Sequence, residues 1–176
     1  MKPLFKTLIP SFDEFLGKRG LRFEGVVIGG AALQLLDIIT RRTKDCDVLT
    51  PVIPPEIKQA SEDFATEAGL VSDWFNNGPA SLLRDLPQGW QAHLRPIYQG
   101  TNLRLLTLGR EDILRSKLFA YVDRGIDEED VIKLNPSKEE INAVLDWVKD
   151  RDANPTWPEY VEMRINDLMR RLYGAD

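Results

Sequence analysis

The chain has 176 residues, a net charge of −5 at pH 7 and 43% hydrophobic residues. This size and composition fit one globular domain, or a compact core with a small helical extension. The acidic balance argues against nonspecific binding to nucleic acid, and we expect no sequence-specific binding to DNA. No apolar run has the length of a membrane span or a signal peptide. One cysteine, Cys46, and one histidine exclude an internal disulfide and the usual zinc ligand set. We therefore expect a soluble, cytoplasmic protein.

The first part of the chain predicts alternating helices and strands. Ser11-Phe12-Asp13-Glu14 has the pattern of a capping box, and Gly69 is placed to end a helix that starts at Pro55. The expected elements are a helix over 11–20, a strand over 23–28, a helix over 31–39, a strand over 45–49 and a helix over 55–68.

The middle of the chain predicts a turn, a short helix and two strands. The turn covers 73–79 and carries two aromatics that we expect to be exposed, Trp74 and Phe75. The short helix is expected over 80–85, and the strands over 90–98 and 102–108.

From residue 110 onward the pattern is helical throughout. Two further capping boxes are predicted, at Ser137–Glu140 and Thr156–Glu159. Helices are expected over 110–123, 127–134, 138–148 and 157–172. The chain therefore predicts an α/β core over 1–109 and a helical C-terminal part, packed on that core, over 110–176.

Two short motifs in the first half suggest chemistry on phosphates. Gly29-Gly30 lies between a strand and a helix, where backbone N–H groups can approach an anion. Asp45 and Asp47 are two residues apart on the next strand, so both carboxylates share one face and can hold Mg²⁺. Thr43, just before them, can orient a carboxylate or touch a phosphate. The combination predicts phosphoryl or nucleotidyl transfer.

Each of these features also has a simpler interpretation. A Gly-Gly pair is often only a turn, and an Asp-x-Asp strand can be a solvated edge. Cys46 is expected to face the core as an inert thiol, and His93 to be structural or exposed. The aromatic turn could stack a base, but a packed loop is the favoured interpretation.

These residues resemble the signature of the polymerase-β-like nucleotidyltransferases, a Gly-Gly turn followed by a strand Asp-x-Asp. The similarity extends to bacterial nucleotidyltransferases akin to the toxins of abortive-infection systems, over roughly residues 25–135. The matching downstream residues are Asp112, Lys117-Leu118-Phe119-Ala120, Arg124, Asp127, Asp130 and Leu134. The resemblance implies a small mixed sheet flanked by helices, with Lys117 on a nucleotide phosphate and Asp130 or Asp127 lining the same cleft.

The resemblance implies a Mg²⁺-dependent enzyme that moves an NMP from an NTP to a hydroxyl of RNA, such as tRNA, or of a protein. It also implies a toxin role with an antitoxin as partner. The sequence departs from the pattern because neither strand candidate after residue 90 contains Asp or Glu, and Ile126 stands where a lysine is expected. Either another carboxylate, such as Asp73, completes the site, or the protein is a regulatory module that binds nucleotide without turning it over.

Overall fold

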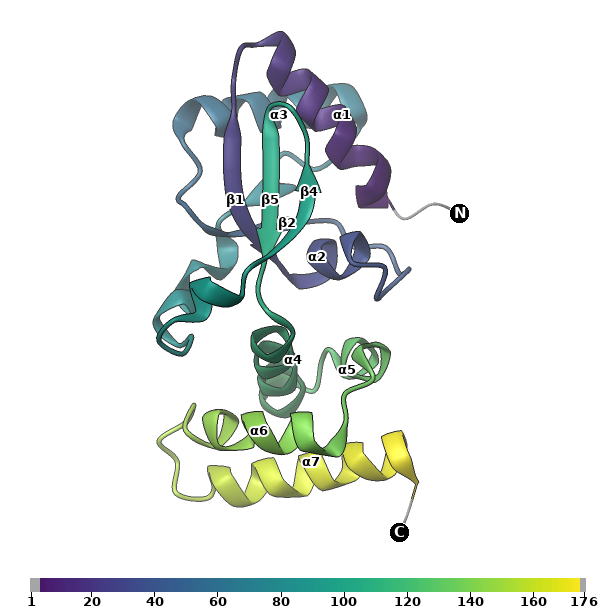
Figure 1. The fold of residues 1–176 in the computed structure, drawn as a ribbon, viewed down its shortest axis with the longest axis vertical. Helices are drawn as coiled ribbons and strands as arrows, with labels where there is room; N and C mark the ends of the chain where they lie inside the picture. The colour runs from purple at the N-terminus through teal and green to yellow at the C-terminus, as the bar shows by residue number, and fades with distance from the viewer. Residues whose placement is uncertain (1–3, 175–176) are drawn as a thin grey trace. The chain divides into compact units, whose positions relative to one another are not determined.

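The computed structural model describes residues 4–174, which divide into two compact units between Gly109 and Arg110. The first unit contains α1 (Leu4–Lys18), β1 (Phe23–Ile28), α2 (Gly29–Leu35), β2 (Cys46–Thr50), α3 (Pro55–Ala68), β3 (Phe75–Asn76), the 3₁₀ helices η1 (Gly78–Arg84) and η2 (Trp90–His93), β4 (Arg95–Gln99) and β5 (Leu103–Thr107). The second contains α4 (Arg110–Arg124), α5 (Glu128–Leu134), α6 (Lys138–Lys149) and α7 (Trp157–Tyr173) (Figure 1). Among the described residues, no helix is long and apolar enough to cross a membrane.

The first unit is built on one mixed sheet with the strand order β3-β2-β1-β5-β4. The central strand β1 is parallel to β5 and antiparallel to β2. The predicted α/β fold with a helical C-terminal part is thereby confirmed. Pro96 lies in β4, an edge strand, where a missing backbone N–H interrupts no central ladder.

The main core packs α1 and α3 on one face of the sheet. Its aromatic centre joins Phe12, Phe64, Trp74 and Phe75, whose neighbouring ring centroids are 5.1–5.7 Å apart. Trp74 also donates a hydrogen bond from Nε1 to the carbonyl oxygen of Ser61 at 3.0 Å. The expectation that Trp74 and Phe75 are exposed is therefore wrong, because both rings are buried in this core, as the packed-loop interpretation has it.

A buried carboxylate on α1 fixes the hairpin between β4 and β5. Asp13 accepts hydrogen bonds from the backbone N–H groups of Thr101, Asn102 and Leu103 at 3.1, 2.7 and 2.7 Å, and from the Tyr98 hydroxyl at 3.0 Å. Burial alone would raise the pKa of Asp13, but the hydrogen bonds from Asn102 and the other donors lower it overall. The carboxylate thus ties α1 to one end of the sheet.

Two capping boxes and one strand are among the predicted elements that differ from the structure. The helix predicted to open with a capping box at Ser11 begins at Leu4, and the Ser11 hydroxyl instead donates to the carbonyl of Thr7 at 3.1 Å inside that helix. The Thr156 side chain makes no cap hydrogen bond to α7, and its hydroxyl donates to Asn154 Oδ1 at 3.0 Å. The strand predicted over 90–98 begins only at Arg95, since residues 90–93 form η2.

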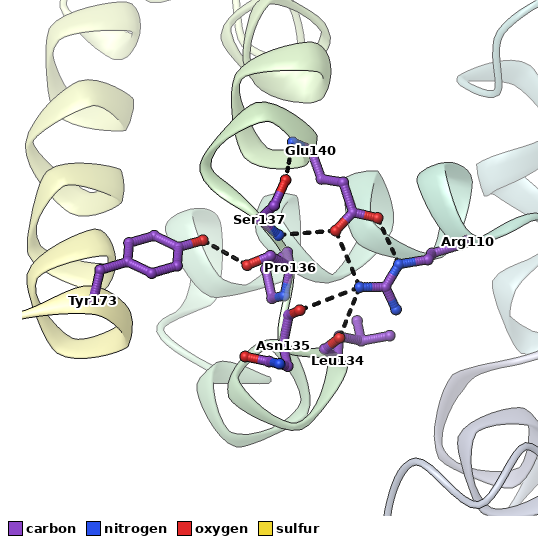
Figure 2. Close-up of polar contacts among 7 residues, drawn as sticks. All are labelled: Arg110, Leu134, Asn135, Pro136, Ser137, Glu140 and Tyr173. Carbon is purple, nitrogen blue, oxygen red and sulfur yellow. Dashed lines mark hydrogen bonds and ion pairs between the residues drawn. The ribbon is translucent and has the colours of Figure 1, made fainter.

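In the helical unit, a polar network fixes the loop between α5 and α6 (Figure 2). Arg110 donates to both carboxylate oxygens of Glu140 at 2.6 and 3.1 Å and to the carbonyl of Leu134 at 2.9 Å. Ser137 and Glu140 form the predicted capping box, which is confirmed. The network joins the first turn of α4 to the start of α6.

Replacing Asp13 with alanine should lower the free energy of unfolding by about 3 kcal/mol at pH 7, because the backbone donors lose a charged acceptor. The folded pKa of Asp13 is lower than the unfolded value of about 3.9. The wild-type advantage should therefore be full above that pH and vanish as the pH falls through the folded pKa. Urea titrations at pH 7 and pH 3 measure this. The adjacent exposed Glu14→Ala is the control, and an equal loss in both variants contradicts the assignment.

Candidate active site

The first glycine of the predicted site lies against the second aspartate. In the antiparallel pairing of β1 with β2, Ile28 is the register partner of Asp47. Gly29 follows with φ +72°, and a Cβ added there would lie 2.9 Å from Oδ2 of Asp47. The positive φ favours glycine, and the missing Cβ leaves room for the Asp47 carboxylate. The structure therefore brings Gly29 and Asp47 together.

The second glycine lies against Thr43. A Cβ on Gly30 would lie 2.9 Å from both Cβ and Oγ1 of Thr43. The buried Gln34 fixes the loop that carries Thr43, because its Nε2 donates to the carbonyl of Arg41 at 2.5 Å. The Oε1 of Gln34 accepts a hydrogen bond from the backbone N–H of Phe5. The helix predicted over 31–39 starts two residues earlier and ends at Leu35, so both glycines lie in its first turn.

The two aspartates stand on either side of a buried cysteine. Asp45 is exposed just before β2, Asp47 is half-buried within it, and Cys46 between them is fully buried. Burial, with a smaller contribution from the Asp47 charge, raises the pKa of the Cys46 thiol, which stays protonated at neutral pH. The cysteine is part of the core, and the flanking carboxylates face away from it.

Asn76, which is not among the predicted site residues, lies beside Asp47 in the sheet. The parallel pairing of β2 with β3 matches Cys46 with Phe75 and Asp47 with Asn76. Asp73, the candidate third carboxylate, is exposed and lies two residues before that strand. Within residues 4–174, no three Asp, Glu, His or Cys side chains form a group that could hold a metal ion. A two-residue strand has no periodic pattern, so the sequence around Asn76 predicted a turn and not a strand beside Asp47.

The predicted residues of the helical unit form a buried ionic cluster. Lys117 Nζ lies 2.8 Å from Asp130 Oδ2 and 3.1 Å from Asp127 Oδ2. The Asp130 side chain is 1% exposed and that of Lys117 is 9% exposed. Because removing one partner would leave an unpaired buried charge, the two ion pairs hold Lys117 against the turn between α4 and α5. Asp112 pairs with Arg115 at 2.6 Å on the same helix.

Two other features of the chain do not add to the site. A cavity of about 420 Å³ in the helical unit is lined by Arg110, Glu111, Leu114, Glu139, Glu140 and Ala143. Its three carboxylates outnumber its one arginine, which is itself paired with Glu140, so the cavity is unsuited to a polyphosphate. His93 is exposed at the end of η2.

Comparison with known proteins places the chain in a family of nucleotidyltransferases of unknown function. A family model described as a nucleotidyltransferase of unknown function (DUF6036) matches residues 5–152, and the chain belongs to this family. The predicted superfamily is confirmed by this match. Searches of curated proteins and of solved structures found no match.

The close approach of Gly29 to Asp47 predicts an unequal response of two glycines to alanine. Gly69 also has positive φ, +67°, but a Cβ there would meet nothing within 4 Å. Gly69→Ala should cost roughly 1–2 kcal/mol from backbone strain alone. Gly29→Ala must also displace the Asp47 carboxylate, and we expect a loss about 1 kcal/mol larger. Urea denaturation of both variants measures the difference, and equal losses would show that the carboxylate imposes no steric constraint.

Proposed function

We propose that the protein is a Mg²⁺-dependent nucleotidyltransferase that moves an NMP from an NTP to a hydroxyl of RNA or of a protein. Membership in a nucleotidyltransferase family supports this activity class. The observation that carries the proposal is the close approach of Gly29 to Asp47, because it brings the glycine turn next to one of the two predicted carboxylates. A toxin role, with an antitoxin as partner, is part of the same proposal and rests on the resemblance alone.

The side chains of Asp45 and Asp47 suit Mg²⁺, which proteins bind through one or two carboxylates together with substrate phosphates. The absence of a side chain on Gly29 keeps the space next to Asp47 Oδ2 open. Asp45 and Asp47 would hold the ion. When bound, the ion would neutralise charge on the triphosphate oxygens and polarise the attacking hydroxyl.

The other residues would bind and orient the nucleotide. The backbone N–H groups of Gly29 and Gly30 would donate hydrogen bonds to the outer phosphates. Thr43, held against Gly30, would touch a phosphate or orient a carboxylate. The resemblance assigns Lys117 a phosphate contact and Asp130 a place in nucleotide binding. Within the helical unit, Lys117 and Asp130 form an ion pair with each other, so this pair would hold both side chains in place before nucleotide binds.

A second function is favoured by one specific observation. Since no third acidic, histidine or cysteine side chain joins the pair among the described residues, the site holds fewer charged ligands than the full superfamily pattern. The protein could then be a regulatory module that binds nucleotide with Mg²⁺ and does not transfer it. Both functions predict binding, and they differ in turnover.

A thermal-shift assay with each of the four NTPs and Mg²⁺ tests the site. A ligand that binds only the folded state, at about 100 times its dissociation constant, adds roughly 2.7 kcal/mol. For a protein of this size that corresponds to a Tm increase of about 5–10 °C. The shift should require Mg²⁺ and be lost in Asp45→Ala/Asp47→Ala.

The control variant Glu56→Ala/Glu67→Ala removes the same charge from exposed positions on α3 and should keep the shift. If no NTP stabilises the wild type, or if the aspartate variant keeps the shift, the glycine turn and carboxylates are not a nucleotide site.

A further inference from the structure

The pairing of β2 with β3 places an amide at the third position of the carboxylate site. Asn76 is the register partner of Asp47 in adjacent parallel strands. Residues paired in this way point to the same face of a sheet and lie within contact distance of one another. Asn76 is thus the immediate cross-strand neighbour of Asp47.

Burial confirms which face these two side chains occupy. Cys46 and its partner Phe75 are buried at 0% and 2% exposure and belong to the core. Side chains alternate along a strand, so Asp47 and Asn76, one residue further on, lie on the opposite face. Both are half-buried there. Asp47 and Asn76 therefore lie next to each other on the face of the sheet opposite the core.

We infer that the side-chain oxygen of Asn76 is the third protein oxygen of the metal site formed by Asp45 and Asp47. The inference rests on the proposed function, because it presupposes a cation at those carboxylates. Amide carbonyl oxygens bind the same hard cations as carboxylates do. An amide in place of a third carboxylate gives the three side chains a net charge of −2 instead of −3. Fewer negative ligands bind a divalent cation more weakly, so we expect a lower metal affinity than three carboxylates would give.

The side chain of Asn76 also makes two hydrogen bonds within its own turn. Its Oδ1 accepts the backbone N–H of Gly78 at 2.6 Å, and its Nδ2 donates to the carbonyl of Asp73 at 3.1 Å. A carbonyl oxygen has two lone pairs, so Oδ1 retains one after this hydrogen bond. Asp73 contributes a backbone carbonyl to this turn, whereas its carboxylate is exposed.

The test is Mn²⁺ binding, followed by electron paramagnetic resonance, in the full chain without nucleotide. Mn²⁺ takes the same oxygen ligands as Mg²⁺. Asn76→Asp keeps the acceptor for Gly78 and adds a charge, so it should tighten Mn²⁺ binding by about tenfold. Asn76→Ala should weaken it several-fold. Asp73→Asn, the matched control, should leave it within about twofold of wild type.

Melting curves without metal give a second measurement and check folding. Asn76→Asp should melt below the wild type without metal, because three carboxylates repel one another and the Asp73 carbonyl loses the Nδ2 donor. Mn²⁺ should restore the part of the stability lost to charge repulsion. The inference is overturned if both Asn76 variants bind Mn²⁺ as the wild type does, or if Asp73→Asn weakens binding. In either case an NTP-induced thermal shift would leave the proposed function standing. Absence of both Mn²⁺ binding and that shift would refute the two together.

Discussion

The candidate site depends on the close approach of a backbone to a carboxylate, at Gly29 and Asp47. The β1–β2 register brings Asp47 beside the end of β1, and the positive φ of Gly29 turns the chain there into α2. Any side chain at residue 29 would occupy the space in front of Asp47 Oδ2. The glycine therefore serves the fold and the site at once. Thr43 against Gly30 repeats the arrangement one residue further along.

The two ends of β1 are held by different chemistry. At its beginning, Phe23 donates to the carbonyl of Asn102, whose own N–H donates to the buried Asp13. At its end, the glycine turn approaches the carboxylate of Asp47. Asp13 is buried, and its carboxylate accepts hydrogen bonds from backbone N–H groups of the protein itself, which stabilises the fold. Asp45 and Asp47, by contrast, lie outside the core. One acidic residue type thus has a structural role at one end of the sheet and a proposed catalytic role at the other.

Sequence patterns predicted the elements whose signals are local. The strand at 23–28, the helix from Pro55 to Ala68 and the Ser137 capping box depend on neighbouring residues, and the structure has all three. The predicted capping box at Ser11 was wrong because Ser11 lies inside α1. The one at Thr156 was wrong because Thr156, although it is the N-cap residue of α7, has a helical backbone conformation and makes no side-chain cap hydrogen bond. The place of Asn76 beside Asp47 could not be predicted, because it comes from pairing between segments about thirty residues apart. Family membership supports the activity class, while the nucleotide and the acceptor remain proposals.

The central claim is transfer of the nucleotidyl group, and the most direct measurement follows the two ends of the triphosphate separately. The protein is incubated with Mg²⁺, an RNA or protein acceptor, and an NTP labelled at either the α- or the γ-phosphate. The account predicts that α-label becomes acid-stable in the acceptor, γ-label does not, and Asp45→Ala/Asp47→Ala abolishes the transfer. Incorporation of γ-label would instead mean phosphoryl transfer. No incorporation of either label despite nucleotide binding would mean a module that binds without turnover.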